Sequence, residues 1–175
     1  GGIVTGASTT VGGTISAASR ASGNTLTIEN SKVGSYVYGG LAMNGTGGIA
    51  EASGNTLNLK NVNAPSLIMP SFAQNNGSGK AVAEGNTVTL QGGTYGGSIF
   101  VSYAYAAGNT ASAGGNTVTL QGGTYSGVIY GSYAHAAGNT SAAQSNAVTE
   151  SATAGDATIR RNTAIAEGNT VTLHD

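Results

Sequence analysis

The sequence predicts an all-β fold in which residues 1–175 form one parallel β-solenoid segment of about six coils, each of about 23–31 residues. Three observations predict this fold. The eleven residues GNTVTLQGGTY occur at 85–95 and again at 115–125. The tripeptide Gly-Asn-Thr recurs at nearly constant spacing, and apolar residues alternate with polar ones inside the repeats.

The repeat unit is defined by the Gly-Asn-Thr motif and its spacing. Copies begin at Gly23, Gly54, Gly85, Gly115 and Gly168, and a degenerate copy, SNAVTE, begins at Ser145. The spacings are 31, 31, 30, 30 and 23 residues, and a period in this range indicates a repeat architecture. The short last spacing predicts that 136–142 is a protruding loop. Loops such as 106–113 and 136–143 are then expected to present variable binding surfaces.

Each repeat is expected to contain short strands rather than helices. Gly, Asn, Thr, Ser and Val are weak helix formers. In NTVTL, Val88 and Leu90 share one face with Asn86, while Thr87 and Thr89 share the other, which is the period of a strand. Gly and Asn between these runs indicate turns. Stacked coils lie about 4.8 Å apart, so that each residue sits on its equivalent in the next coil and like residues form columns.

One inward column consists of asparagines. Its members are Asn24, Asn55, Asn86, Asn116, Asn146 and Asn169. An inward polar side chain is costly unless it is hydrogen-bonded, and stacked amides can bond to one another and to turn backbone. The sequence therefore predicts a structural Asn ladder.

Apolar columns are expected to form a narrow continuous core. They are Leu26, Leu57, Val88, Val118, Val148 and Val171; Ile28, Leu59, Leu90, Leu120 and Leu173; Val37, Ile68, Ile99, Ile129 and Ile159; and Leu41, Phe72, Tyr103 and Tyr133. Glu150 interrupts the second of these, which predicts either an outward bend or a local change of register.

An outward apolar column is the candidate binding surface. It contains Tyr38, Met69, Phe100 and Tyr130 and is followed by Arg160. An exposed stripe of this kind often marks a binding site. The alternative is a stack that only stabilises the solenoid, with Arg160 closing it through a cation–π contact.

A second outward pattern consists of threonine pairs. They are Thr25 and Thr27, Thr87 and Thr89, Thr117 and Thr119, and Thr170 and Thr172, with lapses at Asn58 and Ala147. A regular Thr lattice resembles that of ice-binding solenoids. The alternative is that threonine simply suits an exposed strand.

The composition argues against several other functions. Six Lys and Arg residues spread over a chain of net charge −1 leave no basic patch for nucleic acid. No apolar run reaches the roughly 20 residues of a membrane span, so membrane insertion of this segment is not expected. Without cysteine, thiolate metal sites are excluded. Few carboxylates and two isolated histidines predict no catalytic residues, metal or cofactor, hence no enzyme, although a polysaccharide-active β-helix is kept as an alternative.

The ends of the chain carry no Pro cluster, charge cluster or amphipathic helix that would cap a solenoid. The last coil starts at Gly168, one strand before the end, and a second copy placed after Asp175 would continue the 30-residue spacing. These uncapped ends predict either a part of a longer solenoid or copies that stack head-to-tail.

The stretch GNTVTLQGGTYSGVIYGSYAHAAGNT resembles the repeats of bacterial autotransporter (type V secreted) passenger domains. The resemblance implies a right-handed parallel β-helix displayed outside the cell, on the bacterial surface, commonly as the rigid stalk or fibre of an adhesin. It also implies a receptor or glycan of a host or neighbouring cell as partner. No catalytic or binding residue is carried over, and ice binding or polysaccharide binding remain the alternatives.

Overall fold

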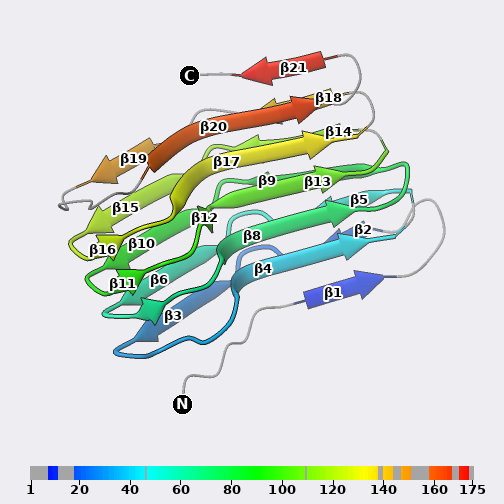
Figure 1. Ribbon diagram of the computed structural model, residues 1–175. Coiled ribbons are helices and arrows are strands. Elements are labelled where there is room, and N and C mark those ends of the chain that lie inside the picture. The colour runs from blue at the N-terminus through cyan, green and yellow to red at the C-terminus, as the bar shows by residue number, and fades with distance from the viewer. Residues whose placement is uncertain are drawn as a thin grey trace.

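The computed structural model describes the backbone of 8–11, 18–45, 47–108, 110–137, 140–143, 147–150, 158–166 and 170–173, and the side chains of 18–45, 47–108 and 110–137. Over these ranges the chain forms strands and turns and no helix, so none of the described segments is a helix that could cross a membrane. Successive turns stack along one axis (Figure 1).

The strands form four parallel sheets that run along this axis. The largest, here called the aromatic sheet, contains β1 (Ser8–Val11), β4 (Val37–Asn44), β8 (Ile68–Asn75), β12 (Ile99–Phe100), β13 (Ser102–Ala106), β17 (Val128–Ala136) and β20 (Thr158–Ala166). The threonine sheet contains β3 (Thr25–Glu29), β6 (Thr56–Lys60), β10 (Thr87–Gln91), β15 (Thr117–Gln121) and β19 (Ala147–Glu150).

The two other sheets complete each turn. The alanine sheet contains β2 (Ala18–Arg20), β5 (Ile49–Glu51), β9 (Lys80–Glu84), β14 (Thr110–Gly114), β18 (Thr140–Ala143) and β21 (Thr170–Leu173). The short sheet contains β7 (Asn63–Ala64), β11 (Thr94–Tyr95) and β16 (Thr124–Tyr125). The chain passes from the threonine sheet through the short and aromatic sheets to the alanine sheet, and then into the next turn. The predicted β-solenoid is therefore confirmed.

The register follows the repeat of the sequence. Thr87 lies opposite Thr56 in one neighbouring turn and opposite Thr117 in the other, so that equivalent residues stack. The structure shows about four turns, fewer than the six coils predicted for the whole chain. The side chains at both ends, on which the prediction of uncapped ends and head-to-tail stacking depends, lie outside the described residues.

The Gly-Asn-Thr motif at Gly168 does not begin another threonine strand, and this prediction is wrong. Thr170 of β21 lies opposite Thr140 of β18, in the alanine sheet. The motif at 168–170 therefore repeats the one at 138–140, thirty residues earlier, rather than the degenerate copy at Ser145. Asn169 itself lies outside the described residues, so its place in the ladder stays a prediction.

The 23-residue spacing between Ser145 and Gly168 is therefore not caused by a missing loop. The stretches 106–113 and 136–143, expected to protrude, contain most of β14 and of β18, which pair with each other. In each turn the chain leaves the aromatic sheet, reverses direction through a short connection and returns as an alanine-sheet strand (Figure 1).

The core has two parts with different side chains. Beside the threonine and short sheets, Val, Leu, Ile and two tyrosines are buried, which stabilises the fold by about 1.5–3 kcal/mol for each large side chain. Between the alanine sheet and the second half of the aromatic strands, the buried apolar residues are all alanines, among them Ala73, Ala104 and Ala111. Only small side chains fit there because the two sheets approach closely.

The Gly-Asn-Thr glycines at 23, 54, 85 and 115 each mark a turn into a threonine strand. Gly54 and Gly85 have a φ of +66°, in the left-handed region that side chains with a Cβ rarely adopt. The turn therefore needs glycine at this position, which explains why the motif recurs.

Candidate functional site

The candidate site is the outer surface of the aromatic sheet. Along β4 the burial alternates as far as Tyr38, after which Gly39 and Gly40 are both buried and the alternation restarts with the opposite parity. The equivalent pairs Pro70–Ser71 and Gly131–Ser132 are also both buried. At this bend the residues on either side of the buried pair point outward. They are three positions apart, whereas outward residues of a regular strand are two positions apart.

The bend corrects one predicted core column. Leu41, Phe72, Tyr103 and Tyr133 were expected to point inward, but all four are half-buried on the outer face. Ser71, Ser102 and Ser132 point inward instead. The expectation failed because it continued the alternation through the bend.

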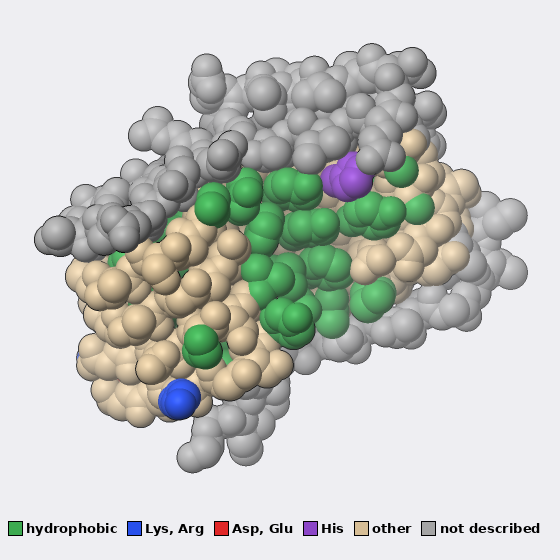
Figure 2. Space-filling model, viewed as in Figure 1, with side chains coloured by type: hydrophobic (Ala, Val, Ile, Leu, Met, Phe, Trp, Pro, Cys, Tyr) green, Lys and Arg blue, Asp and Glu red, His purple; other side chains and the backbone are tan. Residues whose placement is uncertain are grey.

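Three columns side by side make up the surface, which we call the aromatic face. The first column is Tyr38, Met69, Phe100 and Tyr130; the second is Leu41, Phe72, Tyr103 and Tyr133; the third is Met43, Gln74, Tyr105 and His135. In Figure 2 the apolar side chains gather in one area of this face, bordered by a histidine. Met69 is buried, with 5% of its surface exposed, and the other members are half-buried.

Rings within one column stack on each other from turn to turn. Phe100 and Tyr130 have their centroids 4.5 Å apart, with planes 8° from parallel. In the second column the centroids of Phe72 and Tyr103 are 5.1 Å apart. Tyr103 and Tyr133 stack in the same way, with centroids 4.9 Å apart. Stacked pairs of this kind contribute about 0.5–1.5 kcal/mol each beyond the area they bury.

Rings in neighbouring columns meet edge to face. The planes of Phe100 and Tyr103 cross at 73°, and those of Tyr130 and Tyr133 at 82°. Both columns run along the solenoid axis, but the rings of one column are roughly perpendicular to those of the other. The face therefore presents aromatic carbon in two orientations.

Burial changes the pKa values of three tyrosines on this face. Burial raises the pKa of Tyr38, Tyr103 and Tyr133 above the ordinary value of 10.0, and neighbouring tyrosines raise it further. These phenols therefore stay neutral at physiological pH and keep their hydroxyl groups as hydrogen-bond donors.

The register shows which residue types continue the columns beyond the aromatic face at its two ends. Ser8 stands opposite Leu41 and Thr10 opposite Met43, on one side of the face. On the other side Arg160 stands opposite Tyr130 and Thr163 opposite Tyr133. The side chain of Arg160 lies outside the described residues, so the expected cation–π contact stays a prediction. The third column continues from His135 to Ile165, so the residue types that follow the columns are polar only in part.

The Asn ladder is confirmed for the described asparagines, and it includes serines. Asn55, Asn86 and Asn116 are buried, while Asn24 is half-buried. Nδ2 of Asn24 donates to Oδ1 of Asn55 at 2.9 Å. Nδ2 of Asn86 donates to Oγ of Ser102 at 2.7 Å, and Asn116 repeats the contact with Ser132 at 3.1 Å. Asn146 lies outside the described residues. This network holds the sheets together, and its members Asn55, Asn86 and Asn116 are shielded from solvent.

The threonine sheet carries the predicted Thr pairs on its outer face. Thr87 and Thr89 lie in register with Thr117 and Thr119, and all four are at least partly exposed. Asn58 interrupts the second column, as the sequence predicts.

The described carboxylates do not form a catalytic pair. Glu51 lies opposite Val82, and its Oε2 is 2.8 Å from Nε of Arg20. Glu84 lies opposite Gly114 and accepts a hydrogen bond from Oγ of Ser112. Among the described residues no cluster of His, Cys, Asp or Glu could hold a metal ion. His135 packs edge-on against the ring of Tyr105, with centroids 5.3 Å apart.

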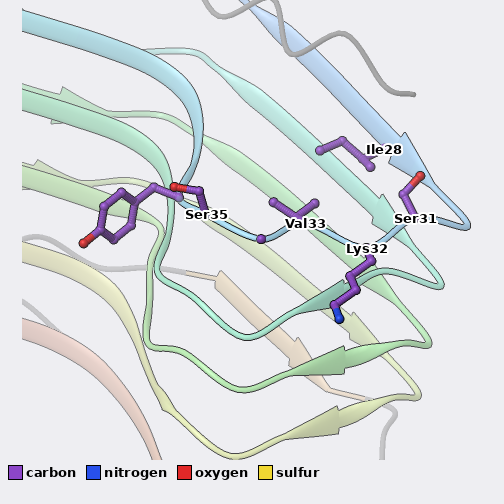
Figure 3. A pocket seen from close by; sticks show the side chains of 7 residues that line it. Ile28, Ser31, Lys32, Val33 and Ser35 are labelled. Atoms are coloured by element: carbon purple, nitrogen blue, oxygen red, sulfur yellow. The ribbon is translucent and has the colours of Figure 1, made fainter.

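A hollow of about 320 Å³ lies beside β3 and the connection to β4 (Figure 3). Its lining includes Ile28 and Val33, which belong to or pack against the main core, together with Ser31, Lys32 and Ser35. Val33 stands in the same column as Ala64, and β3 is the last strand of its sheet. The hollow is therefore the open side of the core at β3 rather than a built ligand site.

A pattern in the sequence could have predicted that the aromatic face contains more than one outward column. Two large residues three positions apart flank Gly-Gly, Pro-Ser, Val-Ser or Gly-Ser in the four turns, as in Tyr38-Gly-Gly-Leu41 and Tyr130-Gly-Ser-Tyr133. Small residues between two such side chains mark a bend, after which the parity changes.

Comparisons with known proteins found no match: no family model, no curated protein and no solved structure is similar to this chain.

Proposed function

We propose that this chain is a rigid β-solenoid segment of a bacterial surface adhesin, which presents the aromatic face outside the cell. The observation that carries the proposal is the half-exposed patch of stacked rings on one side of a rod. The resemblance of the GNTVT…GGTY…IYGSYA repeats to autotransporter passenger domains supports the location.

The solenoid suits such a role because its backbone fixes the positions of the rings. The strands of the aromatic sheet pair in parallel register from turn to turn, which sets the spacing of equivalent side chains. A ligand would then meet a surface that needs little ordering on binding, and preorganisation of this kind favours affinity.

The proposal is tested by displaying the chain on a non-adherent bacterium and counting the bacteria retained on epithelial cells. Replacing Tyr103 and Tyr133 by Thr removes two central rings and keeps residues that suit strands. A matched control replaces Thr89 and Thr119 by Val on the outer face of the threonine sheet. We expect retention by the original chain and a drop of about tenfold for Tyr103→Thr/Tyr133→Thr alone, equivalent to about 1.4 kcal/mol. Retention no better than that of bacteria displaying nothing would refute the proposal.

Ice binding by the threonine sheet is the second candidate. The register of Thr87 with Thr117 and of Thr89 with Thr119 favours it, whereas Asn58 breaks the lattice. Thermal hysteresis that Thr89→Val/Thr119→Val changes would support it, and its absence would leave the adhesin proposal alone.

A further inference from the structure

We propose that the aromatic face binds a neutral oligosaccharide that lies across successive turns of the solenoid. This inference rests on the adhesive function proposed above and names the chemical class of its ligand. It depends on the charge, the chemistry and the size of the face.

The charge of the face favours a neutral ligand. None of the twelve residues in its three columns is Lys, Arg, Asp or Glu, and His135 is the only histidine among them. An acidic ligand would find no described cation to pair with, and desolvating an unpaired charge is costly. A neutral ligand avoids that cost.

The chemistry of the face matches a molecule with both C–H surfaces and hydroxyl groups. Each tyrosine offers an apolar ring beside a hydroxyl that both donates and accepts. Tyr103, Tyr105 and Tyr133 place three such groups within two neighbouring turns. A pyranose has the complementary character, because its ring carbons form apolar patches and its rim carries hydroxyls.

The size of the face favours a narrow ligand over a globular one. Four turns at about 4.8 Å and strand segments of about 17 Å give a patch of roughly 300 Å². A standard protein–protein interface buries about 800 Å² on each partner. A second copy or another protein that covered only this patch would fall short of that area, whereas a few sugar residues would fill it.

The geometry disfavours a peptide. An extended peptide usually adds to a sheet through the backbone, but the backbone of β8, β13 and β17 is paired with neighbouring turns. A proline-rich peptide needs slots between aromatic rings. Phe72, Tyr103 and Tyr133 are in ring contact at 5.1 and 4.9 Å, which leaves no slot between them.

The test uses the purified chain and defined probes. Cellohexaose, chitohexaose and maltohexaose are the neutral probes, hexagalacturonate is the acidic one, and a proline-rich decapeptide represents peptides. Calorimetric titration is expected to show at least one neutral hexasaccharide binding with Kd of about 1 mM or tighter. Tyr103→Thr/Tyr133→Thr should weaken that binding at least about tenfold, while Thr89→Val/Thr119→Val should leave it unchanged.

Circular dichroism and thermal unfolding of each variant establish that it folds. If the Thr variant unfolds, Tyr103→Phe/Tyr133→Phe replaces it, because this variant keeps the rings and loses only hydroxyl groups; it should still weaken the binding. Binding of no neutral probe, tightest binding of hexagalacturonate or the decapeptide, or a dimer in sedimentation that the same variants dissociate would overturn the inference.

A second readout separates the ligand from the adhesive function. Periodate cleaves vicinal diols of sugars, so treating the epithelial cells should abolish retention of the displaying bacteria if a glycan is bound. Unchanged retention on treated cells would overturn the glycan inference while the adhesin proposal stands. No retention on untreated cells would overturn the adhesin proposal itself.

Discussion

Oγ of Ser71 donates a hydrogen bond of 2.6 Å to Oδ1 of Asn86, joining the aromatic strand of one turn to the start of a threonine strand in the next. The same oxygen accepts the backbone N–H of Asn55 at 2.9 Å. One turn further, Ser102 makes the equivalent bond to Asn116, also at 2.6 Å. Each asparagine therefore connects three segments, which gives the ladder a strong effect on stability.

Replacing Asn86 by Ala should be severely destabilising. The change removes the acceptor of Ser71 and Asn55 and the donor to Ser102, all of which are buried. Leaving a buried polar group unsatisfied costs about 1–3 kcal/mol, so we expect a loss of at least about 3 kcal/mol in the free energy of unfolding by urea.

Two further variants test this prediction. Asn24→Ala should cost only about 1 kcal/mol, because Asn24 is half-buried and its side chain donates one bond. Adding Ser71→Ala to Asn86→Ala should cost less than the sum of the single changes, since the serine has already lost its acceptor. Strict additivity would show that the two side chains are not coupled.

The ladder could be predicted from the sequence because the alternation within the threonine strands is unbroken. Asn86, Val88 and Leu90 all keep their predicted inward direction. The second aromatic column could not be predicted by the same rule, because Gly39 and Gly40 restart the alternation between Tyr38 and Leu41. Sequence periodicity is thus informative only as long as no bend intervenes.

The last Gly-Asn-Thr motif shows a second limit of sequence reasoning. The tripeptide serves the turn before a threonine strand at Gly85, yet at 138–140 the same letters lead into the alanine sheet. A short polar motif fixes a local turn but not the sheet that comes after it.

Two stacked tyrosines in the core should respond differently to the same substitution. The rings of Tyr95 and Tyr125 are 5.1 Å apart and almost parallel. The hydroxyl of Tyr125 donates to the carbonyl of Gly122 at 2.9 Å, whereas that of Tyr95 has no partner among the described residues. Tyr125→Phe should cost about 1 kcal/mol, and Tyr95→Phe should be neutral or stabilising in urea unfolding. Equal losses would show that the Tyr95 hydroxyl is satisfied.

The stability of the protein should decline at alkaline pH, in part through Tyr95. Burial raises the pKa of Tyr95 from 10.0 to about 12. Because the folded-state pKa lies above the unfolded one, the stabilisation is complete below pH 10 and is lost as the pH rises to about 12. Through this window the group contributes a slope of up to about 1.4 kcal/mol per pH unit.

Tyr95→Phe isolates this contribution, because other buried tyrosines also titrate at high pH. The difference in urea midpoint between the original chain and the variant should shift in favour of the variant between pH 10 and 12. Tyr36→Phe is the matched control, since Tyr36 is 59% exposed, and it should shift the midpoint less than Tyr95→Phe does. A difference that stays constant from pH 8 to 12 would contradict the prediction.

The alanine core should tolerate no added methyl groups. Ala111 of β14 is fully buried among alanines, and the next residue toward the N-terminus, Thr110, is half-buried on the outer face. Ala111→Val adds two methyl groups where the sheets are close, which should force them apart and cost about 1–3 kcal/mol. Thr110→Val places the same side chain on the other face of the same strand and should stay within about 0.5 kcal/mol of the original in thermal and urea unfolding. Equal effects of the two changes would mean that the sheets leave room for valine, and the narrow alanine layer would then not be a packing limit.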